Sequence, residues 1–441
     1  MTISNQLAPR SRDYVPGEVI VKMRADSELL DSVTDEYNMQ VIERFDLPQN
    51  MLQAMQGDLL HLRLPAGTST EEALARLRQD ARIEYAETND RLYAIGEPVV
   101  PNDLNSKLWG LDNQGQNAGK ADADIDAPEA WKFTTGKTQA QGGPLIAVID
   151  TGTDINHPDL KANLWTNPGE IPGDGIDNDN NGVIDDVHGY NAMDGSGTFI
   201  DDVGHGTHCA GTIGAVGNNE QGVVGVNWNA NLMTVKFLGK NGGTLADAIK
   251  AISYATKMGA RVTSNSWGGG GYNQALKDVL ESSPAMHIFA AGNDSNNNDK
   301  RPAYPASYEL PNIISVAATD RKDGIASFSN FGATSVDLGA PGVDIYSTTP
   351  NDSYRSMSGT SMACPHVSGA AGLLLAQEPT LTNEQLRDLL LSTTDPVASL
   401  QGKTVTGGRL NVASALAKLA GENNPAPPPT DPPSGGGCSP F

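Results

Sequence analysis

The sequence predicts an α/β fold in which a mostly parallel sheet carries helices on both faces, preceded by a small α+β domain. Continuous apolar runs are typical of strands buried on both faces, and they occur at residues 144–150, 232–238, 286–291 and 312–318. Stretches with a helical pattern lie between or after these runs, at residues 245–258, 273–282 and 360–377. Because strands alternate with helices, we expect a parallel sheet covered on both sides.

Residues 1–98 have a different pattern and predict a ferredoxin-like domain. Strand-like segments occur at residues 17–22, 59–64 and 83–89, and helical segments at 27–38 and 70–78, the second with a capping-box start at Thr70. The order βα…βαβ favours helices on one face of an antiparallel sheet. A proline-containing break at 96–102 predicts a boundary, followed by a second domain over 99–422 and a Pro/Gly-rich, linker-like tail over 423–441.

Composition argues against several classes of protein. The 441 residues contain 30 Lys+Arg against 53 Asp+Glu, a formal net charge of −23, which argues against binding of a nucleic-acid backbone. The acidic balance fits a secreted or salt-tolerant protein, or one that holds cations. No apolar run reaches the roughly 18–20 residues of a membrane span, and residues 1–18 show no signal-peptide pattern. Three cysteines exclude a disulfide framework.

Three segments carry the residue types that acyl transfer requires. Asp150 stands at the carboxyl end of a buried run, His205 at a loop-to-helix start, and Ser361 at the N-terminus of a helix of small residues. Catalytic groups in open α/β sheets gather at the carboxyl ends of the strands. An orienting anion, a base with a pKa near neutrality and a hydroxyl that this base can deprotonate form a nucleophilic site. Singly, the three residues would more often be a turn residue, a structural histidine and a helix N-cap.

Jointly, the three motifs favour catalysis and resemble the subtilisin family of serine proteases. The order Asp, His, Ser is typical of that family, and the resemblance extends over roughly residues 101–421. Connecting segments also match the family, at residues 157–160, 264–268, 290–293 and 328–332. Three other histidines match family positions that are not the general base, and a structural role is expected for His157, His208 and His366. Buried thiols are expected at Cys209 and Cys364, whereas Cys438 lies in the tail.

The resemblance implies a role for each catalytic residue. Ser361 would attack the scissile carbonyl, His205 would take its proton, and Asp150 would orient His205. Asn293 would donate to the oxyanion together with the backbone N–H of Ser361. The N-terminal domain resembles the family's inhibitory propeptide, which assists folding and is then removed. The chain is therefore expected to be an autoprocessed zymogen of a serine endopeptidase.

The resemblance also implies a substrate cleft for extended peptides and proteins. Its expected lining residues are Ser266, Trp267 and Gly268 on one side, Gly242 and Gly243 on the facing strand, Ala290 and Gly292 on the other pocket wall, and Ala303 at the floor. None of these residues is charged, so apolar or aromatic P1 side chains are expected. Trp267 is larger than the aliphatic residue expected there. By the same rule self-cleavage should fall between residues 92 and 100, after Tyr93 rather than Arg91.

An acidic segment at 174–186 predicts a calcium site. Asp177, Asp179 and Asn181 alternate, Gly182 follows, and Asp185 is at the ninth place, as in the first part of an EF-hand loop. His188 stands where the twelfth-place Glu would be, so Asp186 is expected to complete the ligands. The alternative is a solvated acidic turn, but five carboxylates in thirteen residues would repel one another without a cation.

A second calcium site is implied by the resemblance alone. Asp159 and Asn219 match the family's high-affinity site. Backbone carbonyls near residues 217, 221 and 223 would complete it, together with an upstream side chain near 109–113. We therefore expect Ca²⁺ at two or more sites.

Two other functions fit the sequence less well. An intracellular subtilase that matures a peptide precursor is disfavoured, because intracellular members tend to have short propeptides. A non-catalytic, calcium-holding adhesion module is disfavoured, because Asp150, His205, Ser361 and Asn293 are all present. We expect a monomer that is secreted or at the cell surface, with the cytoplasm as the alternative, and no nucleic-acid partner or membrane span.

Overall fold

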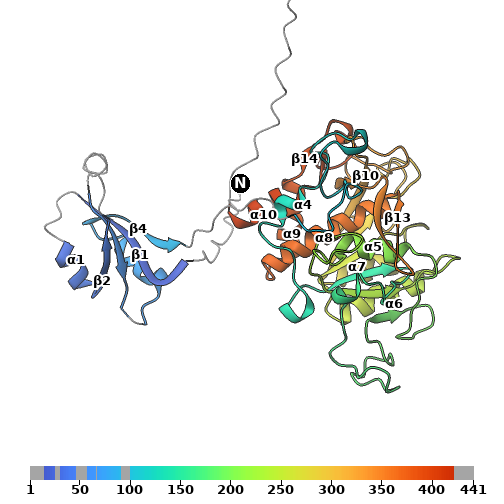
Figure 1. The fold of residues 1–441 in the computed structure, drawn as a ribbon, viewed down its shortest axis with the longest axis horizontal. Helices are drawn as coiled ribbons and strands as arrows, with labels where there is room; N and C mark the ends of the chain where they lie inside the picture. The colour runs from blue at the N-terminus through green and yellow to red at the C-terminus, as the bar shows by residue number, and fades with distance from the viewer. Residues whose placement is uncertain (1–13, 25–29, 46–56, 66, 91–99, 422–441) are drawn as a thin grey trace, which may run out of the picture. The chain divides into compact units, whose positions relative to one another are not determined.

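The computed structural model describes residues 14–24, 30–45, 57–65, 67–90 and 100–421 (Figure 1). The chain divides into two compact units, Met1–Ile95 and Gly96–Phe441, and each is described by itself. The expected tail over 423–441 and the expected cleavage region over 92–99 lie outside the described residues.

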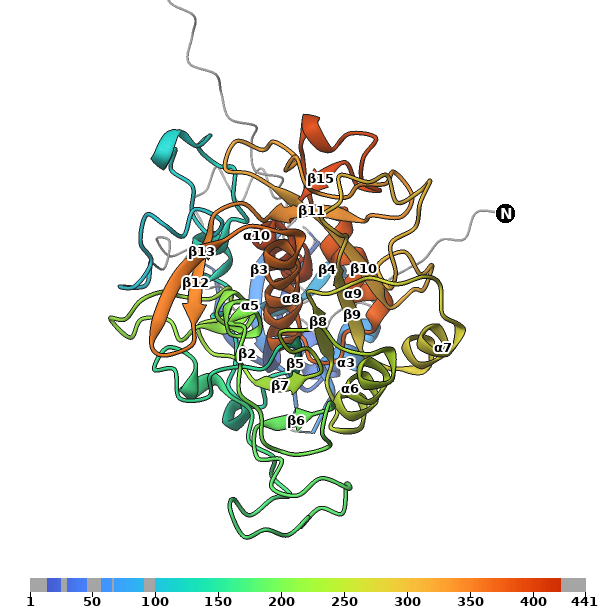
Figure 2. The ribbon, with the colours of Figure 1, turned by 90° about the vertical axis from the view of Figure 1, so that its right-hand side faces the viewer.

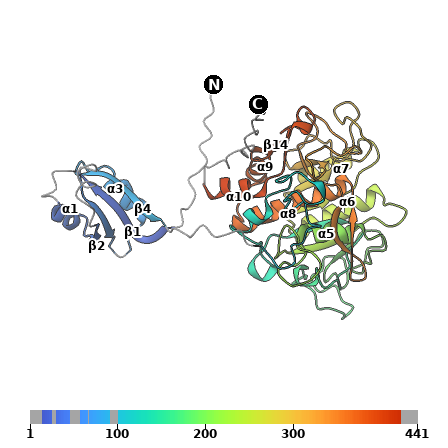
Figure 3. The same ribbon diagram turned by 45° about the horizontal axis from the view of Figure 1, so that its top comes forward.

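The first unit is a four-stranded antiparallel sheet with strand order β2-β3-β1-β4 (Figure 3). Its elements are β1 (Tyr14–Met23), α1 (Leu30–Glu36), β2 (Gln40–Arg44), β3 (Leu59–Arg63), α3 (Thr70–Leu77) and β4 (Ile83–Asp90). This order is that of a ferredoxin-like layer, as the sequence predicted. The helix α3 begins at Thr70, and its N-cap is Ser69, whose side chain accepts from the backbone N–H of Glu72.

The core of this unit lies on one face of the sheet. Val19 and Val21 of β1 and Leu60 and Leu62 of β3 pack there with side chains from both helices. Strand β2 was not predicted from the sequence because all five of its residues are exposed at the sheet edge, so its sequence shows no period-two alternation of burial.

The second unit is built on a nine-stranded sheet with order β14-β15-β11-β10-β9-β8-β5-β7-β6 (Figure 2). Its strands are β5 (Ile146–Asp150), β6 (Gly189–Asn191), β7 (Leu232–Lys236), β8 (Val262–Asn265), β9 (Met286–Ala290), β10 (Ile313–Thr319), β11 (Leu338–Pro341), β14 (Asp395–Pro396) and β15 (Gly408–Arg409). All neighbouring pairs are parallel except β14 with β15. A separate hairpin pairs β12 (Ile345–Thr349) with β13 (Ser353–Met357).

Helices cover both faces of this sheet, as expected. They are α4 (Ala127–Ala130), α5 (His205–Gly214), α6 (Leu245–Lys257), α7 (Gln274–Ser282), α8 (Thr360–Gln377), α9 (Asn383–Ser392) and α10 (Val412–Ala420). Four short 3₁₀ turns are at Gln116–Ala118, Gln139–Gln141, Lys161–Asn163 and Ala398–Leu400. None of the described helices is both long and apolar enough to cross a membrane.

Strand β5 shows how the two faces are filled. Ile146 and Val148 contribute to the core that contains α5 and α8, which lie side by side in Figure 2. Ala147 and Ile149 contribute to the opposite core, with α6 and α7. Because alternate side chains point to opposite faces and both faces are covered, the run is apolar throughout. The central strand β8 was not predicted from the sequence, because it has only four residues and two of them are Ser264 and Asn265.

Candidate active site

Three sequence-predicted side chains meet at the carboxyl edge of the large sheet. Asp150 is the last residue of β5, His205 is the first residue of α5, and Ser361 is the second residue of α8. Strands β5, β7, β8 and β9 are parallel and therefore end at the same edge. The fold thus brings together residues that lie far apart in the chain.

Asp150 holds His205 in one orientation. The Nδ1 atom of His205 lies 2.7 Å from Oδ1 of Asp150, and the backbone N–H of Thr151 donates to the same oxygen at 2.7 Å. The Asp150 side chain is 1 % exposed and that of His205 is 26 % exposed. Burial is the largest single influence and by itself would lower the pKa of His205, but the charge of Asp150, its hydrogen bond and the neighbouring Cys209 together outweigh burial, and the pKa lies well above its usual value. An anion that stabilises the imidazolium so strongly suits a base that must carry a proton during a reaction.

Ser361 and Ser266 exchange hydrogen bonds across the cleft floor. The hydroxyl of Ser361 donates to the carbonyl oxygen of Ser266 at 3.1 Å, and the hydroxyl of Ser266 donates to the carbonyl oxygen of Ser361 at 2.8 Å. In this resting arrangement the Ser361 hydroxyl points to the end of β8. Catalytic hydrogen bonds are often long or misaligned without substrate.

Asn293 is oriented by the start of α8. Its Oδ1 atom accepts from the backbone N–H of Thr360 at 2.9 Å and from the Thr360 hydroxyl at 3.0 Å. The side-chain oxygen is therefore occupied, and Asn293 lines the cleft, where its Nδ2 group can donate. A donor held in place beforehand is what an oxyanion requires.

His205, Ser361 and Asn293 line one cleft, which has a volume of about 960 Å³. Seven of the eight residues predicted to bind substrate line it: Gly242, Ser266, Trp267, Gly268, Ala290, Gly292 and Ala303. Gly243 is not among the lining residues. Gly239 and Gly242 exchange two backbone hydrogen bonds of 3.0 Å, so this segment forms a tight turn, and a side chain at Gly243 would meet the carbonyl oxygen of Phe237.

Trp267 lines the cleft, and its ring packs into the core beneath it. Its ring packs edge-on against Phe237 and Phe289, with centroids 4.7 Å and 5.4 Å away, so most of its bulk belongs to the core.

Sequence reasoning did not find two charged lining residues, Asp294 and Arg301. Both lie in loops that follow strand β9, where the sequence shows no periodicity to indicate which side chains face the cleft.

The two buried cysteines do not compete with Ser361 as nucleophiles. Cys209 lies under His205, with its Sγ 4.0 Å from Nδ1, and Cys364 lies one turn after Ser361 on α8. Burial raises the pKa of both thiols, that of Cys364 to about 12. Both therefore remain protonated near neutral pH, whereas a nucleophilic cysteine requires a thiolate.

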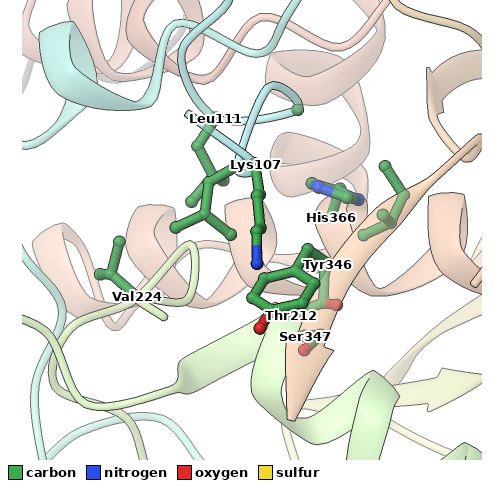
Figure 4. A pocket seen from close by; sticks show the side chains of 10 residues that line it. Lys107, Leu111, Thr212, Val224, Tyr346, Ser347 and His366 are labelled. Atoms are coloured by element: carbon green, nitrogen blue, oxygen red, sulfur yellow. The ribbon is translucent and has the colours of Figure 1, made fainter. Parts of the chain in front are cut away.

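A separate small pocket is unsuited to substrate. It has a volume of about 20 Å³ and lies between residues 107–111 and β12, with Lys107, Tyr346 and His366 around it (Figure 4). That volume holds a single water molecule. The Nδ1 atom of His366 donates to the carbonyl oxygen of Met362 at 2.8 Å, and burial lowers the pKa of His366 to about 4, which agrees with a structural role.

The acidic loop brings together only part of the predicted calcium ligands. Carboxylate oxygens of Asp177 and Asp179 lie within 4.8 Å of one another and of Glu170, which is buried. Glu170 was not predicted, because it precedes the EF-hand-like segment and no spacing rule includes it. Three converging carboxylates suit a hard cation such as Ca²⁺.

The other predicted ligands of this loop have other partners. Asp185 accepts from the backbone N–H groups of Gly173 and Gly175 at 2.8 Å and 3.1 Å. Asp186 is fully buried and accepts from the side chains of Asn167, Asn181 and Tyr254. The side-chain oxygen of Asn181 accepts from the N–H of Val183 at 2.8 Å. Asp185 and Asp186 therefore build the loop rather than face the carboxylate cluster, whereas Asn181 also donates from Nδ2 to Oδ2 of Asp179 in that cluster at 3.0 Å.

At the second predicted calcium site, the upstream side chain that lies beside Asn219 is Asp103. The sequence analysis expected a residue near 109–113 at this place. Asp159 accepts from Asn219 Nδ2 at 2.7 Å, and Asp103 accepts from the backbone N–H of Asn219 at 2.9 Å. Both aspartates are buried, and Oδ1 of Asp103 has no hydrogen-bond partner among the described residues. Burial raises the pKa of each, and the Asp159 charge adds to the rise for Asp103. A buried oxygen without a donor beside a second carboxylate fits a bound cation.

Two models of known protein families match the chain. The model of the subtilase family matches residues 141–418, and the chain belongs to this family of serine endopeptidases. A model of the fervidolysin N-terminal prodomain matches residues 2–89, so the first unit is a prodomain.

Two curated relatives and one solved structure show the extent of the similarity. The chain is 38 % identical to thermitase of Thermoactinomyces vulgaris over 296 residues, which cover 66 % of this chain and 93 % of thermitase. It is 34 % identical to the thermophilic serine proteinase of Bacillus sp. (strain AK1) over 407 residues, 91 % of this chain and 88 % of the relative. A solved protease structure from Pseudoalteromonas arctica aligns with a TM-score of 0.59 and 29 % identity, over 72 % of this chain and 99 % of that one.

Proposed function

We propose that this subtilase is a calcium-stabilised endopeptidase, made as a zymogen that removes its own prodomain, and that Asp150, His205 and Ser361 are its catalytic triad. The observation that carries the proposal is the 2.7 Å contact between Asp150 and His205 in the cleft that Ser361 and Asn293 also line. The proposed domains are a prodomain over 1–98, a peptidase domain over 99–422 and a tail over 423–441.

The proposed reaction follows from the positions of the groups. The Ser361 oxygen forms a bond to the scissile carbonyl carbon while its proton passes to Nε2 of His205. The negative charge that develops on the carbonyl oxygen is stabilised by Asn293 Nδ2 and by the start of α8, whose unpaired N–H groups carry partial positive charge. The C–N bond then breaks, and His205 gives the proton to the leaving amine. A water molecule then attacks the acyl carbon while His205 takes its proton. The bond to the Ser361 oxygen breaks, His205 returns the proton to that oxygen, and the acyl group is released.

The non-catalytic alternative makes a different prediction for a covalent serine probe. A fluorophosphonate should label the mature chain once, and Ser361→Ala should abolish labelling while the protein still folds. A scaffold without activity would take no label in either form. Detection of labelled Ser361 by peptide mass spectrometry therefore separates the two functions.

The proposed P1 preference is for apolar or aromatic side chains. The pocket walls contain Ala290, Gly292 and Ser266, and the floor contains Ala303, with no carboxylate among these four. Full burial of an apolar side chain contributes about 1.5–3 kcal/mol, whereas an unpaired cation loses its hydration. Self-cleavage should therefore follow Tyr93 rather than Arg91. N-terminal sequencing of the mature chain tests this, and a start at Leu92 would contradict it.

Calcium is proposed at two places. Glu170, Asp177 and Asp179 would hold one ion, and Asp103, Asp159 and the Asn219 segment the other. Each ion would neutralise carboxylates that otherwise repel one another and would stabilise the folded chain by mass action. Isothermal titration of the calcium-free protein should show at least two binding events.

We further propose that the enzyme acts as a monomer on protein and peptide substrates outside the cell, with its own prodomain as an intramolecular inhibitor. Activity in culture medium or on intact cells would support this location, and activity confined to the cytoplasm would favour the intracellular alternative. Light scattering of the mature enzyme tests the oligomeric state.

A further inference from the structure

The structure assigns a positioning role to Asp201, a buried carboxylate that joins the turn after Asp150 to the start of the helix that carries His205. This inference rests on the proposed catalytic function of Asp150 and His205. Asp201 is 5 % exposed and belongs to none of the predicted catalytic, substrate or metal groups.

Asp201 accepts five hydrogen bonds from three parts of the chain: Thr151, the backbone just before α5, and Thr207. Its Oδ1 accepts from the Thr151 hydroxyl at 2.8 Å, and from the backbone N–H groups of Gly204 at 2.7 Å and Val203 at 3.2 Å. Its Oδ2 accepts from the backbone N–H and the hydroxyl of Thr207 at 2.9 Å and 2.6 Å. A buried carboxylate with this many donors is fixed in position.

These contacts connect the two members of the Asp–His pair. Thr151 donates its N–H to Asp150 Oδ1, the oxygen that faces His205 Nδ1. The Thr151 hydroxyl donates to Asp201 and accepts from the N–H of Gly206, the residue after His205. The Asp150 carboxylate and the backbone that carries His205 are thus joined through one threonine and one carboxylate.

The backbone segments around the start of α5 are closely packed, which leaves little room for another group to cap this helix. Gly204 precedes α5 with φ of 87°, in the left-handed region that favours glycine, and offers no side chain as an N-cap. A side chain at Gly206 would meet the carbonyl oxygen of Gly152 at 2.1 Å. Asp201, three residues further upstream than Gly204, therefore supplies the anion that a helix N-terminus prefers.

The charge of Asp201 also affects His205. The positive end of α5 disfavours a protonated imidazole at its first residue, and a carboxylate bound to that helix end offsets the effect. Other charged or titratable groups near this point lie on four elements and the preceding loop. They are Asp150 on β5, His208 and Cys209 on α5, Lys236 on β7, which donates to the Thr151 carbonyl and pairs with Asp202, and Arg355 on β13, beside Gly204. Loss of Asp201 should therefore make His205 both less well oriented and less basic.

The test is Asp201→Asn in the full-length chain, with Asp202→Asn as the matched control. Asp202 has the same charge but is exposed and pairs with Lys236 and Lys240. We expect kcat, normalised by fluorophosphonate titration, to fall at least tenfold in Asp201→Asn with KM within twofold. The acid limb of the kcat/KM profile should move to lower pH, and neither change should appear in Asp202→Asn.

An unchanged kcat and acid limb in folded Asp201→Asn would overturn the inference, as would a loss of thermal stability alone. If Asp201→Asn does not fold, Thr151→Val and Thr151→Ser replace it. A loss in Thr151→Val that Thr151→Ser restores supports the role of the hydroxyl link, and equal behaviour of the two variants contradicts it. An unmodified chain that takes no fluorophosphonate would instead refute the proposed function, so the two failures are distinguishable.

Discussion

Buried carboxylates are stabilised in two different ways in two regions of this molecule. At the sheet edge, Asp150 and Asp201 accept hydrogen bonds from N–H and O–H groups that the fold supplies. In the two calcium-candidate clusters the carboxylates face one another, and Asp103 keeps a buried oxygen without a donor among the described residues. In the first region Asp150 faces the imidazole of His205, although its Oδ2 also has no donor among the described residues, whereas in the second region the proposed cation would supply the missing positive charge. Chemistry should therefore depend on the first region and stability on the second.

The largest expected effect is that of Ser361→Ala. Loss of the nucleophile should reduce kcat by about 10⁶, and the chain should stay at full length, because self-cleavage needs the same hydroxyl. Electrophoresis of the purified variant, with no other protease present, measures this. Normal processing would show that the prodomain is removed without the Ser361 hydroxyl.

Asp150→Asn should lower kcat by about 10⁴, because the neutral amide no longer fixes the tautomer of His205. The pKa of His205 should fall as well, since the charge that raises it is gone. His205 acts as a base only when neutral, so the acid limb of kcat/KM should move to lower pH in the variant. A pH–rate series tests this, and an unshifted limb would mean that another group sets the pKa.

Calcium removal should lower thermal stability before it lowers turnover. A ligand at about a hundredfold excess over its Kd stabilises the folded state by about 2.7 kcal/mol, and the cleft itself contains none of the candidate ligands. We expect EDTA to lower Tm by several degrees at low ionic strength, while kcat at room temperature changes little. An unchanged Tm would contradict both calcium assignments.

Glu170→Gln should reproduce part of that loss and weaken calcium binding at one site. The amide preserves the shape of Glu170 but removes one of the three converging charges. Calorimetric titration should show a tenfold or greater rise in one Kd and no change in the other. If both sites keep their affinity, Glu170 is only an acceptor for the N–H groups of Asn178, Asp179 and Asp185.

The smallest expected effect is that of Asp185→Asn on calcium affinity. Its carboxylate accepts from Gly173 and Gly175 rather than facing the cluster. We expect a Kd within threefold of the unmodified protein, with a modest loss of Tm from the loosened loop. A large loss of affinity would restore Asp185 as a ligand, as the EF-hand-like spacing suggested.

Much of this could be predicted from the sequence because the signals are local. Continuous apolar runs, such as the one that ends at Asp150, indicate buried parallel strands and the edge where they end. The same reasoning failed for β2 and β8. One is an exposed edge strand and the other has polar residues at its end, so neither shows a clear period.

The sequence by itself determined the class of fold, through the alternation of apolar runs with helical segments, and the candidate triad and the prodomain, through local motifs and patterns that resemble a known family. Only the tertiary structure decided what each acidic residue does. Four acidic residues that are similar in isolation have different surroundings. Asp103 keeps one oxygen without a donor among the described residues, and Glu170 lies beside two other carboxylates. Asp185 accepts from a turn, and Asp201 accepts from a helix start. The energy of a buried charge depends on the donors and charges around it, and those come from segments far apart in the chain.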